Sequence, residues 1–280
     1  MKKIKYFHVD AFTSEAFKGN PAGVCVLDAF ITTEEMQQIA SELNHSETAF
    51  VVKGSDPEHL YECPLYQLRW FTPEVEVTLC GHATLAASKV LHNEYGIEKN
   101  CITYNTLSGL LYTRISEHGI TMNFPKASHI NIEPSEQLLW YMGISHYERA
   151  IYSEDLHKII IELSSEKDLR RLIPDFEKLR RLDLELDIRG VAVTCKGNGK
   201  YDFMTRYFNP WLGVDEDPVT GSVHTILASY WGEILDKKDL IVYQASKRGG
   251  EIYLSLTDDG RVELSGEAVV IMDGELRLKE

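Results

Sequence analysis

The sequence has no surplus of positive charge. Its 29 lysine and arginine residues are outnumbered by 43 aspartate and glutamate residues, which gives a formal net charge of −14. Proteins that bind nucleic acids or anionic membranes usually present a basic face, so the composition argues against both functions. An anionic small molecule remains possible as a ligand, because backbone amides can bind an anion without any lysine or arginine.

The sequence also lacks a long apolar run and a cysteine framework. No stretch approaches the roughly 18–20 apolar residues of a membrane-spanning helix. The N-terminus begins like a signal peptide, but His8 and Asp10 interrupt its apolar region. The cysteines are odd in number, widely spaced and form no CxxC pair, so we expect free thiols and a cytoplasmic protein. They are Cys25, Cys63, Cys80, Cys101 and Cys195.

What the sequence does contain is a glycine turn at residues 80–84, Cys-Gly-His-Ala-Thr. An extended segment from Arg69 precedes it, and an apolar run that predicts a helix as far as Leu91 follows it. The first turn of a helix leaves backbone N–H groups without intrahelical partners. Together with the helix dipole, these groups can bind a carboxylate or a phosphate.

A second passage repeats this pattern. Residues 69–73 and 206–210 both contain an arginine, an aromatic residue, a phenylalanine, any residue and a proline. A loop follows in each case, and then a glycine, Gly81 or Gly221, opens an apolar helix; the loop is three residues longer in the second passage. Chance is the alternative explanation, since such strands are common. Agreement over several features in the same order favours an internal duplication.

The repeat predicts an α+β fold with two similar halves. Helices that are apolar nearly all round are buried, so each half is expected to wrap β-structure around a central helix. The expected N-terminal half is residues 1–125, with residues 268–280 packed on it, and the C-terminal half is residues 126–267. If the two helix N-termini face each other across a cleft, they can hold a small carboxylate.

Acidic and basic residues differ between the two copies. Glu47 stands between a predicted helix, capped by Thr32 or Thr33, and an apolar strand at residues 49–52. It is either a solvated acid at a strand end or a functional base, because glutamate is rarely buried unless it is paired or functional. His82 aligns with Ser222, and acidic residues 215–217 precede the second turn. Unmatched acids and bases on a duplicated scaffold suggest a proton shuttle in one direction.

Other candidate sites are weaker. Cys80 and His82 with His224 form a sparse metal-ligand set, and zinc sites usually have more ligands. Residues 215–217 are more typical of a solvated acidic turn than of a cation site. We therefore expect no metal. Asn20 and Asp10 either line the cleft or stabilise a turn at Gly19-Asn20-Pro21-Ala22-Gly23.

Four motifs in this order resemble the PhzF (phenazine biosynthesis) family, and the resemblance covers essentially the whole chain. It implies a fold similar to that of diaminopimelate epimerase, with two pseudo-symmetric domains, each a β-barrel-like sheet around a central helix. It also implies a homodimer and catalysis without a metal or an organic cofactor. The motifs lie at residues 19–24, at 46–50, at 69–73 with 80–84, and at 216–222.

The resemblance also implies roles for particular residues. The family member that gives its name isomerises a dihydro-hydroxyanthranilate by moving a proton between ring carbons. The family's general base falls on Glu47 and its supporting acid–base residues fall on His82 and Asp217. The candidate substrate-binding residues are Asn20, Gly81, Gly221 and Ser222, with the two glycine turns binding the carboxylate.

The leading hypothesis is therefore a cofactor-independent isomerase that moves a proton within a small carboxylate-bearing metabolite. One alternative is an amino-acid racemase or epimerase that uses two cysteines, but Cys80 matches only the first position and Thr220 occupies the second. Another alternative is a metabolite-binding protein without turnover. The substrate does not follow from the sequence, because pocket side chains and not the fold set specificity.

Overall fold

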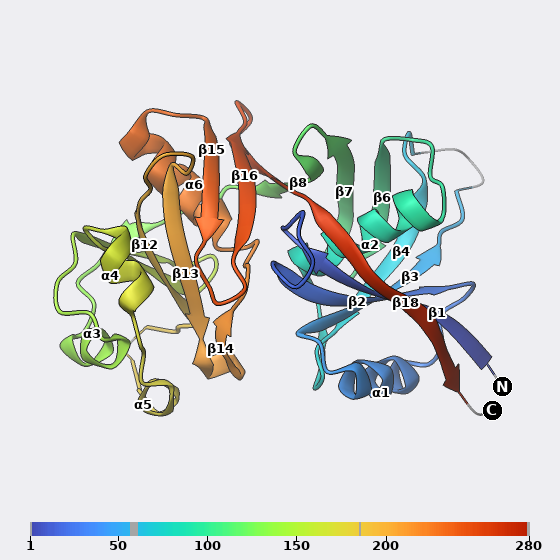
Figure 1. The fold of residues 1–280 in the computed structure, drawn as a ribbon, viewed down its shortest axis with the longest axis horizontal. Coiled ribbons are helices and arrows are strands. Elements are labelled where there is room, and N and C mark those ends of the chain that lie inside the picture. The colour runs from blue at the N-terminus through green and yellow to red at the C-terminus, as the bar shows by residue number, and fades with distance from the viewer. Residues whose placement is uncertain (1, 57–60, 185, 279–280) are drawn as a thin grey trace. The chain divides into compact units, whose positions relative to one another are not determined.

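The chain has a mixed α/β fold that divides into two compact units (Figure 1). The computed structural model describes residues 2–56, 61–184 and 186–278. The first unit contains residues 1–123 and 265–280, and the second contains residues 124–264. The unit boundaries fall within β8 (Gly119–Pro125) and β17 (Arg261–Gly266). No helix of the described residues is both long enough and apolar enough to cross a membrane.

The first unit places two helices, α1 (Thr33–Leu43) and α2 (Gly81–Glu94), among strands. In that unit β1 pairs antiparallel with β2 and β18, and β2 pairs parallel with β3. Strand β3 then pairs antiparallel with β4, which pairs antiparallel with β5 and parallel with β6. The strands are β1 (Lys2–Ala11), β2 (Asn20–Leu27), β3 (Glu47–Lys53), β4 (Leu65–Phe71), β5 (Glu76–Val77), β6 (Cys101–Thr106), β7 (Gly109–Ser116), β8 and β18 (Ala268–Leu278).

The second unit follows the same order of pairing. Strand β10 pairs antiparallel with β11, β11 parallel with β12, and β12 antiparallel with β13. Strand β13 then pairs antiparallel with β14 and parallel with β15. The elements are β9 (Ile130–Asn131), α3 (Glu136–Met142), β10 (Arg149–Ser153), β11 (Lys158–Glu162), α4 (Glu166–Arg171), α5 (Phe176–Arg180), β12 (Gly190–Lys196), β13 (Phe203–Asn209), a 3₁₀ helix (Pro210–Leu212), β14 (Val214–Asp217), α6 (His224–Leu235), β15 (Asp239–Gln244) and β16 (Gly250–Leu256).

Each unit buries one long helix, as the apolar pattern predicts. In α2, Leu85 and Ala86 are fully buried, and in α6 Leu227 and Ala228 are fully buried. Trp231 of α6 is also part of the core, and its indole N–H donates a 2.9 Å hydrogen bond to Thr194 Oγ1. A helix enclosed on its sides offers only its ends to a ligand, so this burial leaves the N-terminal turn as the place for chemistry.

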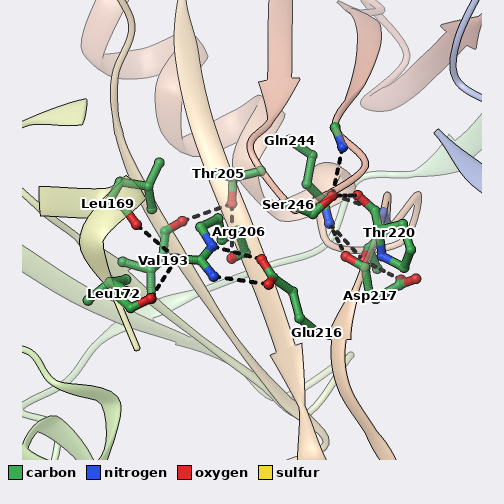
Figure 2. Close-up of polar contacts among 12 residues, drawn as sticks. Leu169, Leu172, Val193, Thr205, Arg206, Glu216, Asp217, Thr220, Gln244 and Ser246 are labelled. Atoms are coloured by element: carbon green, nitrogen blue, oxygen red, sulfur yellow. Dashed lines mark hydrogen bonds and ion pairs between the residues drawn. The ribbon is translucent and has the colours of Figure 1, made fainter. Parts of the chain in front are cut away.

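The repeated arginine makes the same bidentate ion pair in both units. Arg69 donates to the two carboxylate oxygens of Glu76 at 2.6 and 2.7 Å. Arg206 donates to the two oxygens of Glu216 at 2.7 and 2.9 Å (Figure 2). Each guanidinium also lies over the phenylalanine ring two residues later. The planar fork matches a carboxylate, so the arginine ties its strand to the short strand that leads toward the glycine turn.

The structure differs from the sequence-based expectation at several elements, including the short strands β5, β9 and β14, which were not predicted. The stretch expected as a turn at residues 19–23 is mostly strand, because β2 begins at Asn20 and Pro21 lies near the strand start, where its missing N–H is tolerated. Helix α6 begins at His224 instead of Thr220, since residues 221–223 form a tight turn in which His224 N–H donates to the Gly221 carbonyl at 3.0 Å. Strand β15 was not predicted.

The expectation of five free thiols is wrong, because Cys63 and Cys101 form a disulfide. Leu65 of β4 pairs with Thr103 of β6 in a parallel ladder. The two cysteines stand two residues before this pair, so the ladder brings them side by side although 38 residues separate them in the sequence. Only the non-local strand pairing reveals this proximity. Cys25, Cys80 and Cys195 are free and buried.

Replacing Cys101 with serine should destabilise the oxidised protein by up to about 4 kcal/mol, the loop-closure entropy of a loop of this length. Urea unfolding followed by circular dichroism measures the effect. The matched comparison is the same pair of proteins in reducing agent, where the difference should vanish. Equal stabilities under oxidising conditions, or alkylation of five thiols in the unfolded but unreduced chain, would contradict the disulfide.

Candidate functional site

In the first unit, the start of β3 meets the start of α2. Glu47 is the first residue of β3, and Gly81 is the first residue of α2. The His82 Nε2 atom lies 3.3 Å from Glu47 Oε2 and 3.2 Å from Ser46 Oγ. The Ser46 hydroxyl also lies 3.5 Å from Asn20 Oδ1. Four residues predicted from the sequence therefore lie in one cluster, and Ser46, which was not predicted as a site residue, connects two of them.

Glu47 is a carboxyl group in a poorly solvated position. Only 22% of its side chain is exposed, and only 7% of the His82 side chain. Burial raises the pKa of Glu47 above its ordinary value, and the hydrogen bond from Ser46 offsets part of this rise. A carboxylate that is costly to keep ionised is a stronger base than a solvated one, which suits removal of a proton from carbon.

The imidazole of His82 is placed to exchange a proton with Glu47. At 3.3 Å, its Nε2 atom can accept a proton from a protonated Glu47 or donate one to the carboxylate. On the other side of the ring, Nδ1 lies 3.5 Å from Cys80 Sγ. Cys80 is buried, and its side chain makes no capping bond to α2. The arrangement can carry a proton between a carboxyl group and an imidazole at the N-terminus of a helix.

The same three side chains are close enough together to suggest a metal site. Ligand atoms of Glu47, Cys80 and His82 lie within 4.8 Å of one another. However, the short approaches to Glu47 and to Cys80 use opposite nitrogens of one imidazole. These two contacts form a chain from the carboxyl group through the imidazole to the thiol. Three protein ligands are also one fewer than a structural zinc site has.

The residues that precede the cluster in the chain make polar contacts of their own. The Tyr6 hydroxyl lies 2.6 Å from His45 Nε2, and the rings of His8 and His45 pack edge to face. Burial, with smaller contributions from His8 and His82, lowers the pKa of His45 to about 4, so it is neutral at physiological pH. The buried Asp10 carboxylate accepts a 2.7 Å bond from the Phe17 backbone N–H. This contact favours a structural role for Asp10 in its turn.

In the second unit, Asp217 and the turn at Gly221 and Ser222 are braced by Gln244. The Gln244 amide donates to the Asp217 carbonyl at 2.8 Å and accepts from the Thr220 N–H at 2.9 Å (Figure 2). The Thr220 hydroxyl donates to the Asp217 carboxylate. Gln244 is fully buried. Asp217 therefore sits in a hydrogen-bonded frame four residues before Gly221. The sequence offered no local signal for Gln244.

The sequence analysis also missed Lys158. This lysine is 7% exposed, and its ammonium donates a 2.5 Å hydrogen bond to Ser222 Oγ. Burial lowers its pKa to about 8, although the negative charge of Asp217 acts in the opposite direction. A signal was present, because Lys158 opens the run Lys-Ile-Ile-Ile and strands with such runs are buried on both faces.

Comparison with known proteins identifies the family. A family model described as phenazine biosynthesis-like protein (PhzC-PhzF) matches residues 9–274. The chain belongs to this family. A phenazine biosynthesis-like domain-containing protein of Mus musculus is 41% identical over 98% of this chain and 99% of its own length. A protein of Halalkalibacterium halodurans named as an uncharacterised isomerase is 43% identical over 99% of this chain and 100% of its own.

Solved structures show the same fold. A PhzF family protein of Enterococcus faecalis superposes with a TM-score of 0.90 at 38% identity, over 99% of this chain and 100% of the other. A hydroxyproline epimerase of Agrobacterium vitis, 10% identical, shares the fold alone, with a TM-score of 0.61 over 99% of this chain and 93% of the other. The α+β expectation is thus confirmed as a mixed α/β fold like those of PhzF and epimerase structures.

The raised pKa of Glu47 predicts that Glu47→Gln is more heat-stable than the unmodified protein at neutral pH. The folded state keeps the Glu47 proton to higher pH than the unfolded state, so ionisation lowers stability as pH rises through that window. The cost is absent below the ordinary pKa of 4.5 and complete above the folded-state pKa. Glutamine removes it, so the difference in melting temperature should grow from acidic to neutral pH.

Differential scanning calorimetry across this pH range measures the difference. Glu42→Gln, at an exposed position of α1, is the matched control and should follow the unmodified protein. A Glu47→Gln variant that melts lower than the unmodified protein at neutral pH would show that the carboxylate is stabilised in the folded state.

Proposed function

We propose that this protein is a cofactor-independent isomerase that moves a proton within a small carboxylate-bearing metabolite, with Glu47 as general base. The observation that carries the proposal is the contact between Glu47 and His82 at the N-terminus of α2. Relatives named as isomerases support the reaction class. Membership of the family supports the assignment without identifying the substrate.

The reaction balances within the substrate. Glu47 removes a proton from one carbon, and the electron pair of the broken C–H bond moves into the conjugated system. Backbone N–H groups at Gly81 and the positive end of α2 stabilise the negative charge that develops. A proton returns to a second carbon from Glu47 itself or from His82, which exchanges protons with Glu47 across 3.3 Å. No oxidant and no metal enters these steps.

Within the second unit, the proposed supporting acid–base residue is Asp217, and the proposed anion-binding element is the turn at Gly221 and Ser222. The common pairing order and the repeated arginine–glutamate pairs support an origin by duplication, with each half a β-barrel-like sheet around its central helix. The boundaries at residues 125 and 267, the homodimer and the cytoplasmic location stay predictions.

A racemase that uses two cysteines is the competing enzyme. Thr220 occupies the second position, and its hydroxyl donates to the Asp217 carboxylate. A threonine hydroxyl does not ionise to an oxyanion at neutral pH and cannot replace a thiolate. Cys80 is therefore a packed residue beside His82 in this proposal.

Glu47→Gln should slow proton transfer by about 10²- to 10⁴-fold, the usual contribution of a general base. The assay incubates the protein in D₂O with a panel of small carboxylic acids that carry an activated C–H bond, and follows deuterium uptake by NMR. Glu42→Gln should exchange at the unmodified rate. Retention of exchange by Glu47→Gln would eliminate Glu47 as the base.

Cys80→Ala should retain proton exchange within a few-fold, because the thiol supplies no proton in this mechanism. The same D₂O assay, before and after treatment with iodoacetamide, measures the effect. A loss as large as that of Glu47→Gln would favour the cysteine racemase.

A further inference from the structure

Lys158 is a buried cation whose hydrogen bonds are incomplete. An ammonium group has three N–H donors and no acceptor. Among the described residues, one of the donors binds Ser222 Oγ at 2.5 Å, and the nitrogen lies 4.8 Å from the centre of the Tyr207 ring. No ion pair of Lys158 within 4.0 Å occurs among these residues. Buried charges are normally paired, so this ammonium lacks an anion.

A second buried polar group lies on the same face of the sheet. Ser153 of β10 pairs directly with Lys158 of β11 in an antiparallel ladder. Directly paired residues place their side chains on the same face. The Ser153 hydroxyl is fully buried and has no hydrogen-bond partner among the described residues. One face of this strand pair therefore carries both a hydroxyl without a partner and an ammonium whose one hydrogen bond among the described residues is to Ser222.

The hydrogen bond from Lys158 also determines the direction in which the Ser222 hydroxyl can donate. Because Ser222 Oγ accepts from the ammonium, its own hydroxyl hydrogen is directed elsewhere and is available to a ligand. Ser222 belongs to the tight turn before α6, where the N–H groups of residues 221–223 donate to no described residue. Ammonium, hydroxyl and amide donors thus gather at one turn, and all of them favour an acceptor with negative charge.

We propose that Lys158, together with the Ser222 hydroxyl, binds the carboxylate of the substrate in the second unit. The proposal rests on the proposed function. It identifies Lys158, which lies outside the family-like motifs, as the positive charge that recognises the anionic group of the substrate. Lys158 is a binding residue and takes no part in proton transfer from carbon.

The groups around Lys158 give this binding a defined pH dependence. Burial lowers the pKa of Lys158 to about 8. Burial also lowers the pKa of His224 to about 4 and raises that of Tyr207, so both are neutral at physiological pH, while Asp217 favours the ammonium. A bound carboxylate raises the pKa of Lys158 further. Carboxylate binding should therefore weaken as pH rises above about 8.

The test compares benzoate with its neutral analogue benzamide as probes of the intact protein. Binding is measured by isothermal titration calorimetry on the unmodified chain, on Lys158→Met and on Lys196→Met. Lys196 is exposed at the end of β12 and is the matched control. Lys158→Met should weaken benzoate binding about tenfold to a hundredfold, the loss expected for a charged hydrogen bond, and Lys196→Met should not.

A second measurement does not depend on the variant folding. NMR of lysine labelled at the side-chain nitrogen follows the titration of Lys158 in the unmodified protein. Benzoate should raise the pKa of Lys158 and benzamide should not. Equal benzoate affinity in folded Lys158→Met, or a Lys158 titration unchanged by benzoate up to its solubility limit, would overturn the proposal.

Failure of this proposal is distinguishable from failure of the proposed function. Binding is measured without turnover, so retained exchange by Glu47→Gln would remove the isomerase mechanism and leave the benzoate result intact. Conversely, the Lys158 proposal alone would fail if Lys158→Met bound benzoate as tightly as the unmodified protein while deuterium exchange depended on Glu47 as expected.

Discussion

The burial of α2 and α6 is the constraint on which the rest of the structure depends. A helix whose sides are apolar must be enclosed by strands, and the enclosing strands then cover every donor and acceptor except those at the helix ends. In both units the chain reaches the helix through a strand, a proline and a glycine turn. The requirement for a buried helix thus leaves the N-terminal turn of that helix as its open end, as a consequence of packing.

The two units share this scaffold but differ in the charged groups they bring to it. Arg69 and Arg206 make equivalent ion pairs with glutamate. Each pair joins two neighbouring strands that both copies of the scaffold contain. Near the turns, however, the first unit has Glu47 beside His82, and the second has Lys158 beside Ser222. The same scaffold therefore carries an acid–imidazole pair in the first unit and an ammonium–hydroxyl pair in the second.

The sequence predicted most elements because their signals are local. The glycine that opens α2, the cap of α1 at Thr32 or Thr33 and the apolar helix faces depend on neighbouring residues, and these predictions are confirmed, with Thr32 as the cap. The contact of Glu47 with His82 brings together residues that the family-like motifs had identified separately. The disulfide and Gln244 were missed because each depends on contacts between segments that are distant in the sequence. Lys158 was missed although the apolar run that follows it was a local signal of burial. The late start of α6 was missed because a 3₁₀ turn and a helix have the same residue preferences at this length.

Glu47 and Lys158 both bear the free-energy cost of burying a charged group, and the two charges have opposite signs. Burial opposes the charge on each, raising the pKa of the acid and lowering that of the amine. Structural ion pairs remove such costs by pairing the charges within the protein, but Lys158 has no carboxylate within ion-pair distance among the described residues. A protein that needed only stability would gain from neutral side chains at both positions. A bound ligand would complete the interactions that the folded chain leaves open. The charged groups then lower the stability of the free protein but strengthen ligand binding.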